Sequence, residues 1–593
     1  MRRPAKPWPR TEFRTSRWPA VTRDDEFRVR PGRIRHSGSR DSRSFVGQVL
    51  AAAQKAGGRS AGHRSRSSVF GRGRAASLNA LRRVGGRARS VVIKARVVRQ
   101  SSGRAPLGVH VKYLERDGVT RDGAAGQFFD DRGETADGGG FAERCGEDRH
   151  HFRFIVAPED AAELADLKAF TRDLMHQAEA DLGTRLDWIA VDHWNTAHPH
   201  VHVVVRGVDQ DGRDLVISRD YIGEGLRARA SRLATLELGL RTDPEIRRGL
   251  QAEVDAERWT RLDRALAADA QESGGVIDLR HAGSDAGVDL RRMKIARLGK
   301  LERLGLAELA GPGRWRLSPE AEPVLRDLAR RGDVIARIHR SLAEQRLDRG
   351  AETWALDAAP GGAPVIGRLM GRGLDDELAG SGWAVVDAVD GRTHHLRLHS
   401  LEAVTDAPIG AVVEARWVEG RRGRMLTLAV RSDLTIGQQV KADGATWLDR
   451  QLVGREPAPL NETGFGAEVQ GALAARAEHL ASEGLARRNG RRVLFAQDLI
   501  ETLRRRELDA ATARIAGDTG LAHRPIAEGE TVSGVIRRRL ILASGRFAMI
   551  DDGLGFSLVP WRAELQRQLG RQVSGVALPG GLVDWTRGRG LGR

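Results

Sequence analysis

The sequence predicts an α+β protein built from several separate modules. Short strands alternate with amphipathic helices over residues 90–240, and β-rich and helical stretches then follow one another to the C-terminus. With 593 residues the chain is long enough for three or more domains, and 40% apolar residues are enough for real cores. No apolar run is long enough to predict a membrane span. We therefore expect a cytoplasmic protein.

The charge is concentrated at the N-terminus. Residues 1–100 contain 26 Lys and Arg but only 5 Asp and Glu, within a chain of net charge +18. Residues 1–88, rich in Arg, Ser, Gly and Pro, are expected to form a basic and largely disordered arm. Such an arm indicates a polyanionic partner, most often nucleic acid, although a solubilising tail or a mis-assigned start is the alternative. The single cysteine, Cys145, excludes an internal disulfide framework and fits a reducing compartment.

Residues 89–245 are expected to form one domain, an antiparallel sheet flanked by helices. Its strands are predicted from β-branched or alternating runs at 90–99, 151–157, 186–191 and 201–205, the last two as a hairpin. Its helices are predicted from the spacing of apolar residues and from their start and stop residues, at 105–115, 158–183 and 220–240.

Residues 246–345 are expected to be a helical segment. Two helices precede the hairpin 306–318, whose Gly-Pro-Gly tip resembles the wing of a winged helix. The helix before this hairpin carries the cations Arg291, Arg292, Lys294 and Arg297. DNA binding and a purely structural role remain equally open for this segment.

The rest of the chain predicts a small barrel-like β module over 360–440 and a mixed helical and β region over 441–593. Within that region 462–515 is expected to be helical and 534–585 to be β-rich. No repeat of fixed period is visible across these modules. The chain has no GxxxxGK[ST] phosphate-binding loop, which argues against a fused ATPase motor of that type.

Histidine is concentrated in the stretch from His193 to His202, which holds four of the 17 histidines. Alternation along the strand that follows places His200 and His202 on one face, and His193 can approach from the neighbouring strand. His198 has the same parity, but Pro199 interrupts the strand beside it. A shared divalent metal is the predicted function; two half-buried histidines with no common task are the alternative.

Tyrosine is rare, since only Tyr113 and Tyr221 occur in the chain. Lys112 and Arg116 flank Tyr113 and are close enough in sequence to meet a phosphate. A phenol of pKa about 10 attacks well only with the help of a base or a cation. Tyr221, at the start of a predicted helix, is better explained as a packing or surface residue.

Together the motifs resemble a known family. The pattern His193-x-Asn195-x-x-His198-Pro199-His200-x-His202, followed by three valines, resembles the metal motif of conjugative relaxases of the HUH endonuclease superfamily. The type that includes the T-DNA border nuclease is the most similar. Lys112-Tyr113-Leu114-x-Arg116-x-Gly118 is similar to the nucleophile motif of that type. The resemblance covers about residues 90–240, and a long C-terminal region of unknown function also occurs in a relaxase subgroup.

The resemblance implies a DNA relaxase. Tyr113 would nick single-stranded DNA at a transfer origin and form a 5′-phosphotyrosyl intermediate for conjugation or mobilisation. His193, His200 and His202 would hold one divalent ion, Mn²⁺ or Mg²⁺, with a role as base as the alternative for His193. A type IV secretion coupling protein and accessory relaxosome proteins are the partners that the family implies.

Two departures from the family pattern affect the candidate residues. Ala197 occupies a position where members often carry an acidic residue, so His193 or His198 has to serve as the metal ligand. Arg206 occupies a position where asparagine is common, and we expect it to contact DNA with Lys112, Arg116, Arg291, Arg292 and Lys294. A rolling-circle replication initiator, a non-enzymatic DNA-binding regulator and a zinc hydrolase that does not need Tyr113 remain as alternatives.

Overall fold

The computed structural model describes residues 72–73, 87–357 and 362–585, with internal gaps at 101–105, 118, 195, 197, 281–284, 377, 379, 401–402, 405, 421–422, 491 and 580–581. Most of the arm expected over residues 1–88 therefore lies outside the described residues. Its described segment Arg72–Gly73 lies against the first domain. There Arg72 forms an ion pair of 3.1 Å with Asp209 and a backbone bridge with Ile217.

The first domain contains an antiparallel sheet of four strands in the order β1-β2-β4-β3. These strands are β1 (Val91–Arg99), β2 (His150–Pro158), β3 (Trp188–His193) and β4 (His200–Arg206). β3 and β4 pair as the predicted hairpin, with His193 opposite His200. The α+β class predicted from the sequence is confirmed, because antiparallel sheets and helices alternate along the whole described chain.

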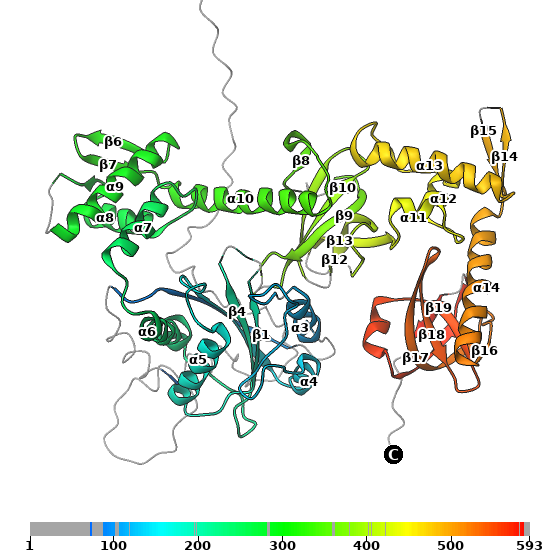
Figure 1. Ribbon diagram of the computed structural model, residues 1–593, viewed down its shortest axis with the longest axis horizontal. Helices are drawn as coiled ribbons and strands as arrows, with labels where there is room; N and C mark the ends of the chain where they lie inside the picture. The colour runs from blue at the N-terminus through cyan, green and yellow to red at the C-terminus, as the bar shows by residue number, and fades with distance from the viewer. Residues whose placement is uncertain are drawn as a thin grey trace, which may run out of the picture.

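Helices cover both faces of this sheet (Figure 1). The first face packs on α5 (Leu167–Leu182) and α6 (Leu226–Leu238) through one apolar core. The second face packs on α3 (Pro106–Asp117) and α4 (Gly138–Arg144), where Leu107, Val111 and Leu114 meet Ile189 and Val204. Strand alternation assigns His193, His200 and His202 to the second face, with Ile189 and Val204.

Two helix starts differ from the predicted ones. The helix expected from residue 158 begins only at Leu167, because the Asp166 side chain accepts hydrogen bonds from the backbone N–H groups of residues 168 and 169 and caps the helix there. The helix expected from residue 220 opens with a π-helical turn, η1 (Tyr221–Gly225), before it continues as α6.

The next subdomain combines three helices with a three-stranded sheet. Its elements are α7 (Asp243–Val254), α8 (Arg261–Glu272), β5 (Ile277–Asp278), α9 (Asp285–Arg303), β6 (Ala307–Gly311) and β7 (Arg314–Leu317). The strand order is β5-β7-β6, and the predicted hairpin forms between β6 and β7. A winged-helix function for this subdomain remains a prediction.

A long helix, α10 (Ala321–Glu344), leads from this subdomain into the first β module (Figure 1). The short 3-10 turn η2 (Ala351–Thr353) comes before the strands of the module. The strands are β8 (Trp354–Ala355), β9 (Val365–Leu374), β10 (Gly382–Ala388), β11 (Thr393–Leu398), β12 (Val412–Gly420) and β13 (Gly423–Ser432). They form one sheet in the order β13-β12-β9-β10-β11-β8, in which β8 pairs parallel to β11.

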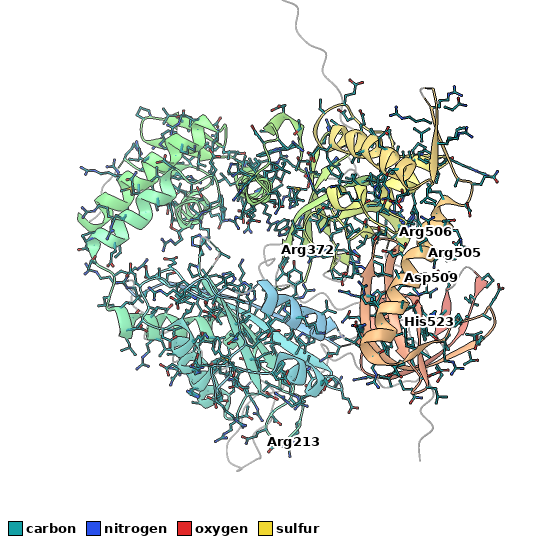
Figure 2. The ribbon with its side chains drawn as sticks, turned by 45° about the vertical axis from the view of Figure 1, so that its right-hand side comes forward. Arg213, Arg372, Arg505, Arg506, Asp509 and His523 are labelled. Carbon is teal, nitrogen blue, oxygen red and sulfur yellow. The ribbon has the colours of Figure 1, made fainter. Side chains whose placement is uncertain are left out.

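Residues 436–523 form helices around one hairpin. The helices are α11 (Ile436–Val440), α12 (Trp447–Val453), α13 (Gly464–Ser482) and α14 (Leu499–Thr519). The helical stretch expected over 462–515 is formed by α13 and α14, but β14 (Ala486–Asn489) and β15 (Arg492–Phe495) interrupt it as a hairpin. Arg505, Arg506 and Asp509 lie on α14, which ends close to His523 (Figure 2).

The second β module completes the chain. Its strands are β16 (Ala522–His523), β17 (Thr531–Leu542), β18 (Gly545–Asp551), β19 (Gly555–Pro560), β20 (Gln572–Ala577) and β21 (Val583–Trp585). Residues 563–568 form the short 3-10 helix η4, whose Leu565 belongs to the core of this module. The sheet order is β16-β19-β18-β17-β20-β21, with β16 parallel to β19.

The two β modules share one architecture, although no fixed-period repeat is visible in the sequence. Written from the other edge, the second sheet has the order β21-β20-β17-β18-β19-β16, which repeats β13-β12-β9-β10-β11-β8 strand for strand. A long helix precedes each sheet, α10 in one case and α14 in the other. A glycine also occurs at the same place in both sheets, where the neighbouring strand leaves no room for a side chain. A Cβ atom on Gly367 would lie 2.3 Å from the carbonyl oxygen of Asp387, and a Cβ atom on Gly534 would lie 2.4 Å from the carbonyl oxygen of Asp551. The C-terminal region therefore contains a structural duplication.

Among the helices of the described residues, none is long and apolar enough to cross a membrane.

Candidate active site

Three histidines converge at the end of the β3–β4 hairpin. His193, His200 and His202 are all buried, and each offers a ring nitrogen within 4.8 Å of those of the other two. The ring centroids of His193 and His202 are 4.5 Å apart, and those of His200 and His202 are 5.0 Å apart. The strand register produces this arrangement, because His193 lies opposite His200 and Val191 lies opposite His202.

A hydrogen bond orients the ring of His200. Nδ1 of His200 lies 2.9 Å from the carbonyl oxygen of His198. Because a carbonyl only accepts, Nδ1 carries the proton and Nε2 keeps its lone pair. This Nε2 atom lies 3.2 Å from Nε2 of His202. His198 therefore orients the site with its backbone, while its own side chain is exposed.

This set of donors fits a transition metal ion better than Mg²⁺. The group found among the described residues contains three imidazoles and no carboxylate. Imidazole suits Zn, Cu, Fe and Ni, whereas Mg²⁺ prefers oxygen ligands. A ring held by a hydrogen bond from its other nitrogen, as in His200, is the usual arrangement for a metal ligand.

The predicted nucleophile, Tyr113, lies on α3 next to this site. Nε2 of His193 donates to the carbonyl oxygen of Leu114 at 3.3 Å, which joins β3 to α3. The Tyr113 side chain is only 7% exposed and belongs to the apolar cluster of the first β module, with Leu369 and Val413 among its members. The tyrosine is thus close in the fold to the histidines, but the first β module covers it.

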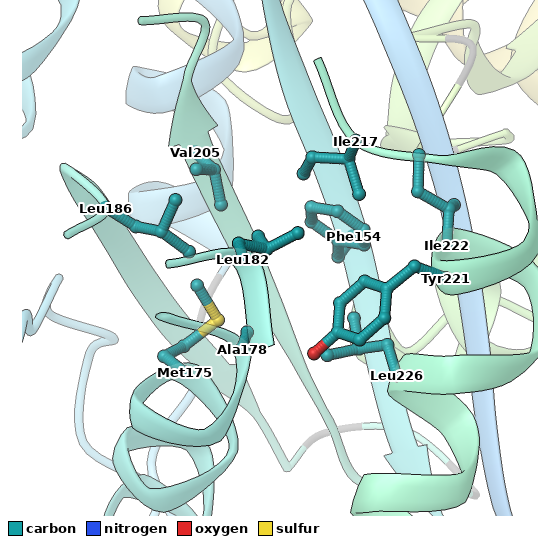
Figure 3. Close-up of a pocket in the computed structure, with 10 residues that line it drawn as sticks. All are labelled: Phe154, Met175, Ala178, Leu182, Leu186, Val205, Ile217, Tyr221, Ile222 and Leu226. Carbon is teal, nitrogen blue, oxygen red and sulfur yellow. The ribbon is translucent and has the colours of Figure 1, made fainter. Parts of the chain in front are cut away.

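Tyr221 lies in the core of the first domain. Its ring lies among apolar side chains between the sheet, α5 and α6, on the first face of the sheet (Figure 3). Its hydroxyl donates to Asp181 at 2.8 Å, and Asp181 also pairs with Arg229. Burial, followed by the nearby Asp181 carboxylate, raises the pKa of Tyr221. This supports the packing role expected from the sequence.

The predicted DNA-binding cations have different surroundings. Lys112 is exposed, and the side chain of Arg116 lies outside the described residues. Arg206 forms an ion pair with Asp148 at 2.8 Å, and this hydrogen bond raises its pKa. A contact of Arg206 with DNA would therefore compete with a carboxylate.

The cations predicted on α9 are mostly bound within their own subdomain. Arg291 donates to the carbonyl of Leu279, and Lys294 pairs with Asp269 at 2.5 Å. Arg297 is fully buried and forms an ion pair with Asp263. Arg292 is exposed, so it is the member of this set that is open to a partner.

Arg153 is a candidate that sequence reasoning missed. It lies on β2 opposite Val204, and therefore on the face that carries the three histidines. It is 5% exposed, and its Nε donates to Nε2 of His151 at 3.0 Å. Burial, followed by the charge of Arg96, lowers its pKa to about 9. Within the described chain, no carboxylate pairs with it. The signal in the sequence was His151-x-Arg153 within an otherwise apolar strand.

Cys145 is not suited to nucleophilic chemistry. It is buried at the end of α4, and burial raises the pKa of its thiol to about 12. A thiol with that pKa remains protonated at neutral pH.

Comparison with known families supports the relaxase resemblance. Residues 134–235 match the family described as Relaxase, MobA/VirD2-like, nuclease domain. This segment contains the three histidines and Arg153, whereas Tyr113 lies before it. The protein thus carries a relaxase nuclease domain of the HUH type.

Two matches to one further family cover the C-terminal half. Residues 294–422 and 414–593 both match the family described as protein of unknown function, DUF3363, and the chain belongs to that family. No curated protein and no solved structure matches the chain.

Proposed function

We propose that the protein nicks one DNA strand at a transfer origin by attack of Tyr113 on a backbone phosphate, for conjugative transfer or mobilisation. The convergence of three buried imidazoles beside the helix that carries Tyr113 is the observation that supports this proposal most strongly. A divalent cation held by His193, His200 and His202 would act on the phosphate as a Lewis acid.

The reaction is a transesterification. The phenol oxygen of Tyr113 forms a bond to phosphorus while the bond from phosphorus to the 3′ oxygen breaks. The 5′ end stays on the enzyme as a phosphotyrosine, and the phenol proton ends on the released 3′-OH. Attack by that hydroxyl on the phosphotyrosine rejoins the strand, so that no nucleotide cofactor is consumed.

Cations near the histidines would position the strand. Lys112 is exposed one residue before Tyr113, and Arg153 is a buried guanidinium without a carboxylate partner among the described residues. A guanidinium binds phosphate well because its donors match two oxygens at once. We assign both residues to the phosphates that flank the nick.

The first β module must move before the reaction begins. Its sheet buries Tyr113, and its turn at Gly380 approaches Arg153, since a Cβ on that glycine would lie 3.3 Å from Nη1 of Arg153. A DNA strand thus reaches both residues only after this module shifts. The single-stranded substrate has to compete with an intramolecular contact.

A covalent adduct is the decisive test. The full chain is incubated with Mn²⁺ and single-stranded oligonucleotides that tile the DNA around its own gene, and the products are run on a denaturing gel. A band at the mass of protein plus DNA is expected, and it should be absent without metal. No adduct with any oligonucleotide would favour a non-enzymatic DNA-binding regulator, or a hydrolase that cleaves without a covalent link.

A rolling-circle replication initiator is the second candidate, because it shares this chemistry. The family match at residues 134–235 is to the nuclease domain of mobilisation relaxases, and it favours transfer over replication. Transfer of a plasmid carrying the nicked sequence into a recipient, scored with and without the gene, would separate the two functions.

A further inference from the structure

The duplication in the C-terminal region extends to the helical subdomains. In the first copy, the buried Arg297 donates to Asp263 and to the backbone carbonyls of Val254, Ala256 and Arg258. In the second copy, the buried Arg476 donates to Asp449 and to the carbonyls of Val440, Ala442 and Gly444. Both ion pairs are completely buried. The three carbonyl residues and the aspartate have the same spacing in both copies, whereas the arginine follows the aspartate by 34 residues in the first copy and by 27 in the second.

The corresponding helix caps also agree. Thr260 and Asp263 form a capping box at the start of α8, and Thr446 and Asp449 form one at the start of α12. In each copy a glycine follows the helix that carries the buried arginine, and a hairpin comes next, β6–β7 or β14–β15. The two hairpins are therefore equivalent parts of two related subdomains. The charges on the two hairpins can therefore be compared position by position.

The arginines of the first hairpin are paired with carboxylates, of which Asp278 is shared with Arg280. Arg314 forms an ion pair with Asp278 at 3.3 Å, and Arg316 pairs with Glu308 across the hairpin. Each guanidinium has a carboxylate partner within the same subdomain. This hairpin therefore offers less positive charge to a polyanion than a hairpin whose arginines have no carboxylate partner.

The second hairpin presents exposed arginines. Arg487, Arg488 and Arg492 are all exposed, and Arg488 pairs with Glu478 on α13. Over the part of the chain that the structure describes, no carboxylate pairs with Arg487 or Arg492. The register places Arg487 opposite Leu494 and Asn489 opposite Arg492, so the two unpaired arginines share one face of the hairpin.

The shape of this hairpin suits a nucleic-acid groove. β14 and β15 project from the edge of the molecule (Figure 1). Gly490 has φ of +60°, a conformation that allows a tight turn at the tip. A two-stranded β-ribbon fits the major groove of B-form DNA, and arginines along it can reach the phosphates on either side.

We infer that the β14–β15 hairpin binds the phosphate backbone of duplex DNA, outside the nuclease site. A duplex fits better than a single strand, because Phe495, at the half-buried base, is the one aromatic residue of the two strands. Single-strand binding normally uses exposed aromatic rings on which bases stack. Phosphate contacts carry no sequence information, so the binding is expected to be independent of sequence. This inference does not depend on the nuclease chemistry proposed above.

The base of the hairpin rests on α14, which extends the basic surface. Leu485 and Phe495 pack with Leu499 and Leu503 of that helix. Arg505 and Arg506 are exposed on the same helix (Figure 2). A duplex that lies on the hairpin could continue along α14, where these two arginines would add phosphate contacts.

The experiment measures how the affinity for a duplex depends on salt. The full chain and its Arg487→Gln/Arg492→Gln variant are titrated with a labelled 30-base-pair duplex at several NaCl concentrations. Loss of two phosphate contacts should lower the slope of log K against log salt by about 1.8. Two duplexes of unrelated sequence should show the same change. The variant should form the covalent adduct on single-stranded DNA as the wild type does.

The first hairpin supplies the matched control. Arg314→Gln/Arg316→Gln removes the same number of charges from the equivalent hairpin, and the slope is expected to stay at its wild-type value. An unchanged slope in Arg487→Gln/Arg492→Gln, or an equal loss in the control, would overturn the inference. A loss that appears with single-stranded DNA but not with the duplex would also overturn it. All four positions are exposed, so folding should be unaffected; circular dichroism checks this.

Discussion

His193 donates a hydrogen bond from Nε2 to the carbonyl oxygen of Leu114, the residue after Tyr113, at a distance of 3.3 Å. This bond leaves Nδ1 of His193 as its acceptor nitrogen, and it ties the candidate metal site to the helix of the candidate nucleophile. A shift of α3 would thus change the position of the His193 ring.

Replacement of Tyr113 by phenylalanine should abolish the covalent adduct. The substitution removes only the attacking oxygen, and binding of single-stranded DNA should stay within about twofold of the wild type. Tyr221→Phe is the control, because its hydroxyl bonds Asp181 in the core and should matter for stability alone, at about 1–3 kcal/mol. Adduct formed by Tyr113→Phe but lost in Tyr221→Phe would transfer the role of nucleophile to Tyr221.

The three converging histidines should differ from His198 in metal binding. We expect His193→Ala, His200→Ala and His202→Ala each to lose most of the affinity for Mn²⁺ and the cleavage activity. His198→Ala should keep much of both, because the contact it makes to His200 comes from its backbone carbonyl, which alanine retains. Calorimetric titration of Mn²⁺ into the four variants measures this. Weak binding in His198→Ala with normal binding in His193→Ala would exchange their roles.

The cover over Tyr113 predicts a change in tyrosine reactivity. Tyr113 and Tyr221 are the only tyrosines of the chain, and both are less than 10% exposed. Tetranitromethane should therefore nitrate neither in the free protein. A single-stranded oligonucleotide that forms the adduct should expose Tyr113 before cleavage, which can be followed in the metal-free protein by mass spectrometry of tryptic peptides. Equal nitration of Tyr113 with and without DNA would show that the β module does not move.

The buried His395 predicts a loss of stability in mild acid. Burial, followed by the charge of Arg337, lowers its pKa from 6.5 to about 4, and its ring stacks on Trp383. Between these two values the unfolded chain binds a proton that the folded chain does not, so stability falls as pH drops from about 6.5 towards 4. The loss approaches about 3 kcal/mol at the lower limit.

Calorimetric melting at pH 7 and pH 5 tests this for the full chain and for His395→Leu. The transition of the first β module should shift less with pH in the variant. His150 and His151 also have lowered pKa values, so the difference between the two proteins isolates His395. An identical pH shift in both proteins would contradict the prediction.

The convergence of His193, His200 and His202 could be predicted from the sequence because strand geometry is local. Val201 to Val205 are β-branched, and alternation alone places His200 and His202 on one face. By contrast, the burial of Tyr113 depends on Leu369 and Val413, which are far away in the chain and come close only in the folded protein. No periodicity near Tyr113 could indicate that contact.

Other features escaped prediction because their local signals were weak or misleading. The β14–β15 hairpin begins Ala486-Arg487-Arg488-Asn489, residues without the β-branched side chains typical of strands. Only a few residues are the same at corresponding positions of the two copies, such as Arg297 with Arg476 and Gly367 with Gly534. The stretches between these positions differ in sequence. Matches this sparse cannot be recognised in the sequence until the structure shows the hydrogen bonds that these residues form.

The repeated sheet also has a consequence for how the chain folds. Two modules with the same strand order in one polypeptide are able to exchange equivalent strands while both are incomplete, which is a known failure of tandem domains. A difference between the corresponding strands opposes such exchange. β9 has the buried Met370 where β17 has Arg537, a charged side chain that is exposed in its own module. A β17 strand placed in the first sheet would bury that charge. Divergence of the two copies therefore also protects the chain against misassembly.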